Sequence, residues 1–376
     1  MERSMFKPAI QQTWVLVTMA VLAVVLFYSA SAIQVEHVAG DYDLKIKAAE
    51  RMTHAMTILK NVRMAEAVFI DDVNDPNHTG LIGRQSSFIT TDEGDLDSKI
   101  SVLDPNVAAM MVQLLRQAGA QSGDTIAITM TGSMPGANLA VYCAIEELKL
   151  VPIIMSSLGA SQWGANDENF TWLDMEKTLL DSGIISFHSS GASIGGGSDI
   201  GRRLSPLGRD LIQQAITRNN IPELEGVDLE DAIQLRMAFF ASHLPLSHYK
   251  AYINVGGGAA ALGSRLTDRL IPAGLTTRMD FDQFPTDGTL VQFGQKRVPI
   301  LHVLNIREFF NLFGYPYAAV PPPAIGSSEL YASTRYSKTA TAVALILIMG
   351  MVVGVGIKSK RMIRHHLQEH EPDSYV

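Results

Sequence analysis

The fold is decided by DTIAITM (Asp124 to Met130), a short apolar and β-branched run of the kind that forms a buried parallel strand. It breaks into TGSMPGAN (Thr131 to Asn138), whose glycines and proline force a tight turn. LAVYCAIEEL (Leu139 to Leu148) then has apolar residues at helical spacing, and VPIIMSS (Val151 to Ser157) is a second strand. Strand, glycine turn, helix and strand make a βαβ unit, and we expect its crossover to be right-handed.

The same alternation continues along the chain. Asp104 to Gly119 predicts a helix with Asp104 as its cap, Pro105 in the first turn and Gly119 as its stop. Further expected elements are helices at Asp41 to Phe69, after Ser205-Pro206 and at Asp228 to Leu244, a strand at Lys250 to Val255, and one more strand and helix from GTLVQF (Gly288 to Phe293) through PILHVLNIREFFNLFG (Pro299 to Gly314). We therefore predict an α/β fold with a Rossmann-like, largely parallel sheet.

Composition limits the function classes. The 376 residues suffice for one large domain or two modest ones, and 47% hydrophobic against 18% charged residues fits a globular core plus membrane segments. A formal net charge of −8 without a basic patch argues against nucleic acid as a partner. Cys143 is the single cysteine, so an intramolecular disulfide and a CxxC zinc site are excluded.

Two uncharged stretches predict transmembrane helices. Thr13 to Ile33 has the length of about 20 residues that crosses a bilayer. Ala30-Ser31-Ala32 also fits a signal-peptide cleavage site, but the apolar stretch is long for a signal core and we favour an uncleaved anchor. Thr339 to Ile357 is the second stretch. The basic residues that follow it and mark the cytoplasmic side are Lys358, Lys360, Arg361 and Arg364.

These segments predict a two-pass protein of the cytoplasmic (inner) membrane. The expected parts are a cytoplasmic tail (1–12), a transmembrane helix (13–33), an extracytoplasmic α/β domain of one or two lobes (34–338), a second transmembrane helix (339–357) and a cytoplasmic tail (358–376).

Ligands of open α/β sheets bind outside the carboxyl ends of the strands, so the glycine loops there are the candidate sites. Three loops qualify: Gly132 to Gly136, Ser189 to Gly201 and Gly256 to Gly258. Converging backbone N–H groups favour an anion. The alternative is that these are plain sheet-to-helix turns. The candidate ligand-binding residues are Gly132, Ser133, Gly136, Asn138, Ser190, Ser193, Gly195, Gly196, Gly197, Asp199, Arg202 and Arg203.

Evidence for a nucleophile is weaker than evidence for an anion site. Ser133 lies at a strand-to-helix turn, as in a nucleophile elbow, but its surroundings are not GxSxG. Ser133 is thus a candidate nucleophile or a hydroxyl donor to an anion, and we favour the donor. Histidines that would supply a base are His188, His243, His248 and His302.

Two acidic loops are candidate metal sites by composition. DDVNDPNHTG (Asp71 to Gly80) matches no calcium loop and is interpreted as a solvated turn, and TTDEGDLDSK (Thr90 to Lys99) is of the same kind. The sequence therefore predicts no metal site and defines no cofactor.

Four segments together resemble the poly-γ-glutamate system protein family. They are ITTDEGDLDSK, GDTIAITMTGSMPGANLAV, IMSSLGASQWGANDENFTWLDME and SIGGGSDIGRRLSPLGRDLI, within about Lys45 to Phe313. Gly159 to Glu176 is the most distinctive piece. Its Trp163, Asn166 and Asp167 form a polar, aromatic loop that either binds a ligand or packs as a structural loop.

The resemblance implies a pathway rather than a reaction, because the family offers no catalytic motif to carry over. It implies a membrane-anchored accessory protein of poly-γ-glutamate synthesis or export, with the polymer and the membrane proteins of the synthase as partners. The alternative is a hydrolase or transferase that trims or releases the polymer with Ser133 as nucleophile. A third hypothesis is a sugar-phosphate-binding domain, since the strand, Gly-Ser turn and helix also resemble the sugar isomerase fold.

Overall fold

The computed structural model describes residues 6–285 and 287–369, with Arg265 described by its backbone alone. The chain divides into two compact units, Met1–Val38 with Ala332–Val376, and Ala39–Tyr331. The outer ends of both predicted cytoplasmic tails, residues 1–5 and 370–376, lie outside the described residues.

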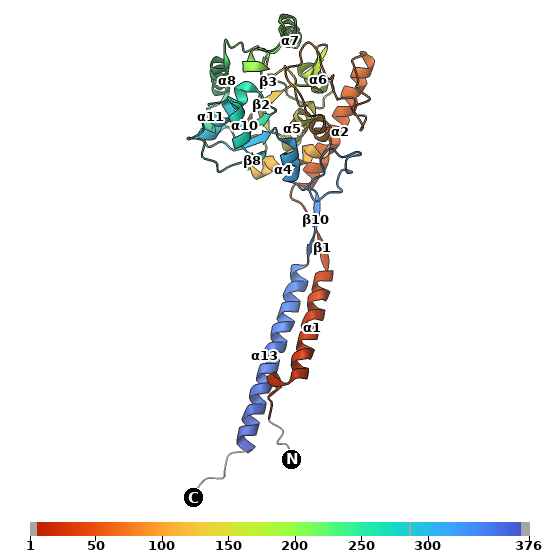
Figure 1. Ribbon diagram of the computed structural model, residues 1–376, viewed down its shortest axis with the longest axis vertical. Coiled ribbons are helices and arrows are strands. Elements are labelled where there is room, and N and C mark those ends of the chain that lie inside the picture. Colours follow the sequence, from red (N-terminus) through yellow and green to blue (C-terminus); the bar gives the residue numbers. More distant parts are fainter. Residues whose placement is uncertain (1–5, 286, 370–376) are drawn as a thin grey trace. The chain divides into compact units, whose positions relative to one another are not determined.

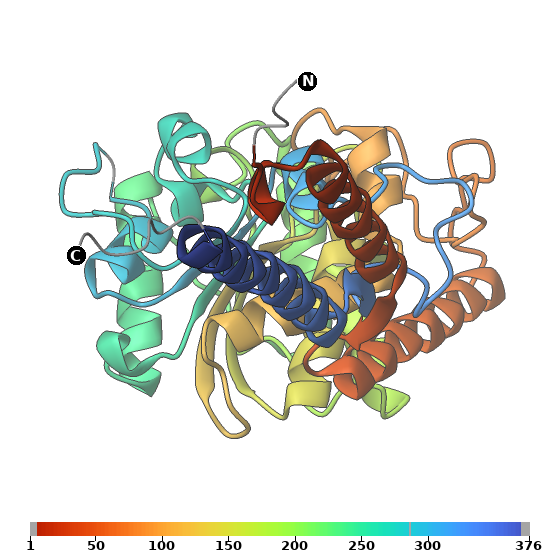
Figure 2. The same ribbon diagram turned by 90° about the horizontal axis from the view of Figure 1, so that it is seen from below.

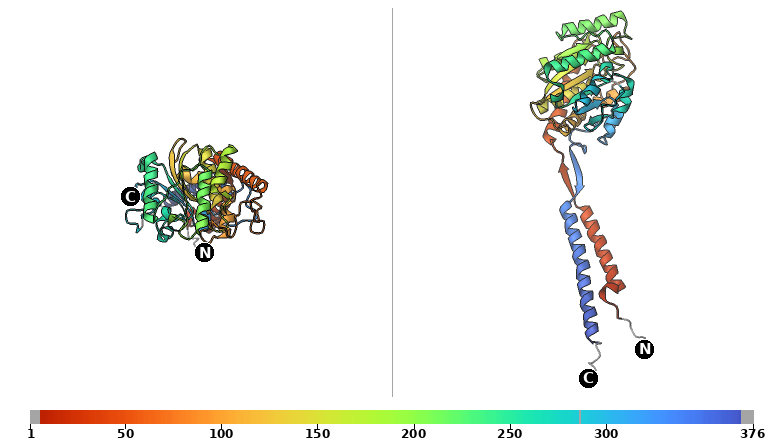
Figure 3. Two further views of the ribbon diagram at one scale, coloured as in Figure 1. Left: turned by 90° about the horizontal axis from the view of Figure 1, so that it is seen from above. Right: turned by 90° about the vertical axis from the view of Figure 1, so that its left-hand side faces the viewer.

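The first unit pairs the two ends of the chain. Its elements are η1 (Ala9–Gln11), α1 (Thr13–Ala32), β1 (Gln34–Val38), β10 (Ala332–Tyr336) and α13 (Lys338–Glu369). Helices α1 and α13 lie side by side (Figures 1 and 3). Strands β1 and β10 are antiparallel, with Gln34 opposite Tyr336 and Val38 opposite Ala332.

Both helices are long and apolar enough to cross a membrane, as the sequence predicts. Their apolar side chains are mostly exposed on all sides, which suits a lipid environment better than a packed core. Helix α13 does not end with its apolar part at Ile357. It continues to Glu369, so the basic residues from Lys358 to Arg364 lie on the helix rather than in an unstructured tail.

The second unit is an α/β domain. Its elements in order are α2 (Tyr42–Ala65), α3 (Leu96–Val102), α4 (Asn106–Gln117), β2 (Thr125–Thr131), α5 (Pro135–Leu148), β3 (Val151–Ser157), β4 (Asn166–Asp167), β5 (Phe170–Thr171), α6 (Trp172–Asp181), β6 (Gly191–Ser193), η2 (Gly197–Asp199), α7 (Pro206–Arg218), α8 (Leu229–His243), η3 (Leu246–His248), β7 (Tyr252–Val255), α9 (Ala259–Leu262), α10 (Arg265–Leu270), β8 (Gly274–Thr276), α11 (Thr289–Gln295), β9 (Ile300–Val303) and α12 (Ile306–Asn311).

The central sheet has the strand order β6-β3-β2-β7-β9-β8. Its strands are parallel except for β8, which runs antiparallel to β9 at one edge. From β2 the chain builds outward to β3 and β6 on one side, then returns to place β7 and β9 on the other. The prediction of an α/β fold with a largely parallel sheet is confirmed.

The last third of the domain has more elements than the expected strand and helix. Within GTLVQF, Gly288 is the N-cap of helix α11 and the other five residues belong to that helix, which buries Leu290, Val291 and Phe293. Strand β9 and helix α12 follow. The short edge strand β8 has no clear signal in the sequence.

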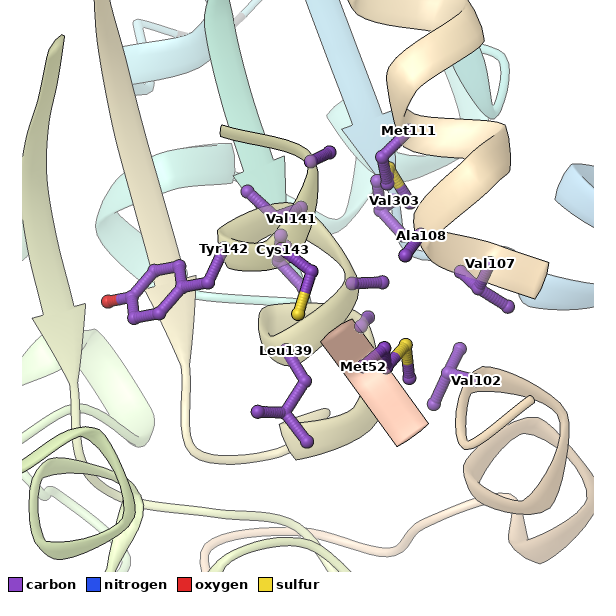
Figure 4. Close-up of a cluster of buried hydrophobic side chains, with 14 of the residues drawn as sticks. Met52, Val102, Val107, Ala108, Met111, Leu139, Val141, Tyr142, Cys143 and Val303 are labelled. Atoms are coloured by element: carbon purple, nitrogen blue, oxygen red, sulfur yellow. The ribbon is translucent and has the colours of Figure 1, made fainter. Parts of the chain in front are cut away.

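Helices cover both faces of the sheet, because β2 is apolar toward both. Ile126 and Ile128 point into a cluster formed with α2, α4 and α5, whereas Ala127 points into a cluster formed with α8 and α11. Figure 2 shows α2 on one side of the central strands and α8 and α11 on the other. Figure 4 shows the first cluster, in which Cys143 packs among apolar side chains.

The predicted turn between β2 and α5 requires glycines because neighbouring backbone carbonyl groups pack closely against it. A Cβ on Gly132 would lie 2.6 Å from the carbonyl oxygen of Leu158, and one on Gly136 would lie 2.5 Å from that of Val102. Asn138 fixes the turn by donating from Nδ2 to the carbonyl of Thr131 at 2.9 Å.

A buried ion pair joins β3, β6, η2 and α8. Arg236 Nη2 lies 2.7 Å from Asp199 Oδ2, and both side chains are at most 3% exposed. The same guanidinium donates to Ser157 Oγ at 2.7 Å and Ser193 Oγ at 2.8 Å. Both hydroxyls donate in turn to Asp199 Oδ1. Each charge is thus paired and hydrogen-bonded, which is what burial of charge requires.

We expect Asp199→Ala to reduce the free energy of unfolding by about 3–5 kcal/mol, because it leaves the Arg236 charge buried and unpaired. The measurement is urea unfolding of the detergent-solubilised chain, followed by tryptophan fluorescence, to which the buried Trp172 contributes.

The control is Asp181→Ala, which breaks the exposed Lys177–Asp181 pair and should cost no more than about 1 kcal/mol. Equal losses from the two variants would contradict the assigned role of the buried pair.

Candidate functional site

A cavity of about 550 Å³ lies at the carboxyl ends of the parallel strands. It is lined by the end of β2, the end of β3 and the loops that follow β6 and β7, which meet where the chain reverses its direction of building the sheet. The lining residues are Thr91, Asp92, Glu93, Gly94, Asp95, Lys99, Thr131, Ser133, Met134, Ser157, Gly159, Ser161, Gly196, Gly197, Ser198, Arg202, Arg203, Leu229, Gly256, Gly257, Gly258, Ala259, Leu262, Gly263, Ser264 and Leu304.

The loop Gly256–Gly258 brings backbone against the end of β2. Gly256 has φ +86°, and a Cβ there would lie 2.3 Å from Thr131 Oγ1, so only glycine fits. Its amide donates to the carbonyl of Val303 at 2.9 Å. Within the described part of the chain, the amides of Gly257 and Gly258 have no acceptor, and both residues line the cavity.

Lys99 is the most buried charged side chain on the cavity wall, at 2% exposure. Its Nζ donates to the carbonyl oxygen of Ser133 and to Ser161 Oγ, the latter at 2.8 Å. The amide of Ser161 donates to Ser133 Oγ at 3.0 Å. These contacts join helix α3, the turn after β2 and the loop after β3 around one amino group.

Burial lowers the pKa of Lys99 to about 7, against the smaller opposing effect of the Asp95 carboxylate. Asp95 caps α3 by accepting from the Ser98 amide at 2.6 Å and also accepts from the Tyr317 hydroxyl at 2.8 Å. Burial of Asp95 favours its neutral form, but these hydrogen bonds outweigh it and hold its pKa below the usual value. Burial therefore favours the neutral amine of Lys99, beside the Ser161 hydroxyl.

The remaining charges lie at the rim. Arg203 Nη1 pairs with Asp92 Oδ1 at 2.7 Å, and both side chains are more than half exposed. Arg202 is exposed and forms no ion pair with another described residue. Glu93 adds a second exposed carboxylate on the rim. The site thus offers arginines and amides to an anion and sets carboxylates opposite them.

Five of the predicted ligand-binding residues line the cavity: Ser133, Gly196, Gly197, Arg202 and Arg203. The others lie outside its wall. Gly132, Gly136 and Asn138 shape the β2–α5 turn. Ser193 and Asp199 belong to the Arg236 network beneath the cavity.

Two more predicted residues contribute backbone geometry. Ser190 pairs with β3, its amide donating to the carbonyl of Ile154 at 2.9 Å. Gly195 has φ +80°, and its carbonyl accepts from the amide of Gly201 at 2.8 Å.

The distinctive loop residues Trp163, Asn166 and Asp167 also lie outside the cavity wall. Asn166 Oδ1 accepts from the amide of Arg84, and its Nδ2 donates to the carbonyl of Arg84 and to Thr90 Oγ1. Asp167 pairs with Arg84 at 3.1 Å. Trp163 has φ +59° and a largely packed indole. This loop therefore fastens the segment before Thr90 to the domain, and that segment leads into the cavity rim.

The four histidines considered as bases do not line the cavity. His302 is buried on β9 and lies 3.1 Å through Nδ1 from Asn254 Nδ2, while His243 and His248 are exposed. His188 Nδ1 lies 2.7 Å from the carbonyl oxygen of Ser189.

The first acidic loop, Asp71 to Gly80, is stabilised by hydrogen bonds within the loop, in which Asp71 and Asp75 accept from nearby amides. Within residues 6–285 and 287–369 there is no group of three or more His, Cys, Asp or Glu side chains that could hold a metal ion.

Sequence reasoning missed Lys99 and Ser161. A signal for Lys99 exists, because at helical spacing it shares a face with Leu96 and Leu103, where a lysine is out of place unless it has a role. Ser161 carries no such signal. The loop Thr91–Asp95, interpreted from sequence as one of two solvated acidic loops, forms the rim of the cavity.

Comparison with protein-family models, curated proteins and solved structures gives no match for this chain.

We expect the free energy of unfolding of the wild type, relative to Lys99→Met, to rise as the pH rises from about 7 to about 10. The Lys99 pKa is about 7 in the folded chain against 10.5 for an ordinary lysine, so between these values the unfolded state binds more protons. Raising the pH therefore favours the folded state. Urea unfolding of both proteins at several pH values measures the difference.

Lys177→Met, at an exposed lysine, is the control and should track the wild type at every pH. If the wild-type and Lys99→Met curves run parallel, Lys99 does not titrate differently in the folded chain.

Proposed function

We propose that this chain is a membrane-anchored accessory protein of poly-γ-glutamate synthesis or export, and that it binds the anionic polymer at the cavity. The observation that supports this best is the convergence of Arg202, Arg203 and the unpartnered amides of Gly257 and Gly258 on one cavity at the strand ends. The sequence resemblance supplies the pathway, and the membrane proteins of the synthase are the proposed partners.

The ligand chemistry follows from the groups at the cavity. Each γ-linked glutamate carries one free carboxylate and one backbone amide. Arginines and backbone amides bind carboxylates through charge-assisted hydrogen bonds, while the cavity hydroxyls of Ser133 and Ser161 suit the amide groups. Because the chain has a net charge of −8 and carboxylates on the same rim, attraction must come from these local groups and not from the overall field.

We further infer that the domain is Rossmann-like in the position of its ligand crevice on the sheet. In open parallel sheets the ligand crevice forms where neighbouring strands are connected in opposite directions. Here that point lies between β2 and β7, and the cavity is lined by Thr131 at the end of β2 and Gly256–Gly258 after β7.

We also propose that α1 and α13 anchor the chain in the cytoplasmic membrane with the α/β domain outside. Lys358, Lys360, Arg361 and Arg364 follow the apolar part of α13, and basic residues of this kind are retained in the cytoplasm. An uncleaved α1 then places the other terminus on the same side.

A cysteine introduced at the exposed Glu93 should react with a membrane-impermeant maleimide in intact cells, because the cavity rim is proposed to face outward. The native Cys143 is 1% exposed and should give little background. Gln368→Cys, on the exposed surface at the end of α13, is the matched control and should react only after lysis. Reaction of Glu93→Cys only in lysed cells would reverse the proposed sidedness.

Replacing both Arg202 and Arg203 by alanine should weaken binding of a fluorescent γ-linked glutamate oligomer about tenfold or more, since hydrogen bonds from charged donors contribute about 1.5–3 kcal/mol. The measurement is fluorescence anisotropy with the purified full chain in detergent. Binding of the wild type should also weaken as salt is added.

The matched control is Arg297→Ala, which breaks an exposed arginine–aspartate pair outside this cavity and should bind as the wild type does. Equal affinity of all variants would remove the cavity from the proposal. If loss of the gene changes neither the amount nor the length of cellular polymer, the pathway itself is wrong.

A further inference from the structure

Two serines and a lysine meet on one wall of the cavity in an arrangement that polymer binding does not require. Lys99 Nζ lies 2.8 Å from Ser161 Oγ and also donates to the carbonyl of Ser133. The Ser161 amide donates to Ser133 Oγ at 3.0 Å, and this hydrogen bond holds the two serines next to each other. Ser161 is partly exposed to the cavity, while the amino group behind it is buried.

We propose that Lys99 and Ser161 form a catalytic dyad for cleavage of an amide bond, with Ser161 as nucleophile, Lys99 as general base and Ser133 as a positioning residue. The substrate class, an amide in a carboxylate-bearing chain, rests on the proposed function; the dyad itself rests on the contacts among these three residues.

The position of Lys99 separates it from a merely structural buried lysine. Lys45 is equally buried, but its Nζ is held by Gln113 Oε1 and the carbonyl of Leu330, both at 2.7 Å, away from the cavity. Lys99 instead has a hydroxyl as one of its two partners and lines the cavity. Within the described part of the chain it makes no ion pair that would keep it charged.

The reaction balances with water as the co-reactant. Ser161 Oγ bonds to the amide carbonyl carbon while its proton moves to the neutral Nζ of Lys99, and the carbonyl electron pair moves to oxygen. When that pair returns, the C–N bond breaks and the Lys99 ammonium gives its proton to the leaving amine. Water then attacks the Ser161 ester, losing a proton to Lys99, which returns it to Ser161 Oγ. The products are a carboxylic acid and an amine.

Other groups at the cavity complete the site. The unpartnered amides of Gly257 and Gly258 are donors for negative charge that develops on the substrate oxygen or for a substrate carboxylate. Ser133 Oγ accepts from the Ser161 amide and so fixes the loop that carries the nucleophile. Ser133, the candidate nucleophile from the sequence, therefore positions Ser161, the proposed nucleophile.

The pH dependence of the dyad is set by the charged groups around it. Those lining the same cavity are Asp92, Glu93, Asp95, Arg202 and Arg203. From helix α12, which packs against α3, Arg307 acts on Asp95, and Glu308 lies on the same helix. Asp95 is the carboxylate that raises the Lys99 pKa, and it does so by less than burial lowers it. Loss of the Lys99 proton near neutral pH should therefore switch the nucleophile on.

The test is labelling of the full chain in detergent with a fluorophosphonate probe, which reacts with activated serines irrespective of the natural substrate. We expect the label on the peptide that carries Ser161, a rate that rises with pH with its midpoint near 7, and loss of labelling in Ser161→Ala. Lys99→Met should lower the rate by about 100-fold or more, the range general-base assistance covers. The controls are Ser182→Ala and Lys177→Met, both at exposed sites, and they should label like the wild type.

Lys99→Arg keeps a cation but cannot act as a base, so it should be as inactive as Lys99→Met. Unchanged tryptophan fluorescence, to which the buried Trp172 contributes, shows which variants are folded. If the lysine variants do not fold, Ser161→Ala still tests the dyad, because it removes only one oxygen atom. Label on Ser133, no label on the wild type, or an unchanged rate in folded Lys99→Met would each overturn the dyad.

Incubation with γ-linked polyglutamate then separates this inference from the proposed function. Shortened chains and new amines with the wild type, but not with Ser161→Ala, support both. A labelled Ser161 with polymer neither bound nor cut keeps the dyad and overturns the polymer as substrate. Bound polymer with an unlabelled Ser161 keeps the accessory role and overturns the dyad.

Discussion

The domain depends on the buried ion pair between Arg236 and Asp199. Taking both charges out of water is costly, so the arrangement persists only because Ser157 and Ser193 satisfy the remaining donors and acceptors. Those four residues come from β3, β6, η2 and α8. The requirement that all of them meet fixes where the glycine-rich loop after β6 leaves the sheet, and so fixes one wall of the cavity.

The polar groups of the cavity come from that wall and from the ends of the neighbouring strands. Ser157 belongs to both the ion-pair network and the cavity lining. Helix α3 places the Lys99 amino group against Ser161 Oγ, where burial removes the hydration that an ammonium needs and lowers its pKa. One network therefore pairs a buried charge completely, while its neighbour leaves a buried amine with a hydroxyl as partner. The first arrangement stabilises the structure, and the second is the one in which we propose a catalytic dyad.

Several elements were readable from local chemistry alone. The strands at Thr125–Thr131 and Val151–Ser157 are apolar runs long enough to be buried, and Ser205 and Asp228 cap α7 and α8 as their sequence signatures indicate. The region after Gly274 is harder to predict, because a short apolar segment such as Thr289–Gln295 can form a helix or a strand according to what it packs against. Among the predicted site residues, the sequence cannot distinguish glycines that are needed for close packing, such as Gly132 and Gly136, from glycines that line the cavity, such as Gly196 and Gly197.

From the sequence alone follow the order of strands and helices from α4 through β3, the glycine turns at the strand ends and the two apolar helices near the chain ends. Each of these follows from hydrophobic period, turn chemistry or length, which are properties of neighbouring residues. Which groups share the cavity depends instead on tertiary packing. Lys99 and Ser161 are separated by 62 positions, and Asp199 and Arg236 by 37. Such pairings are set by how the sheet and its helices pack, so no local pattern in the chain could reveal them.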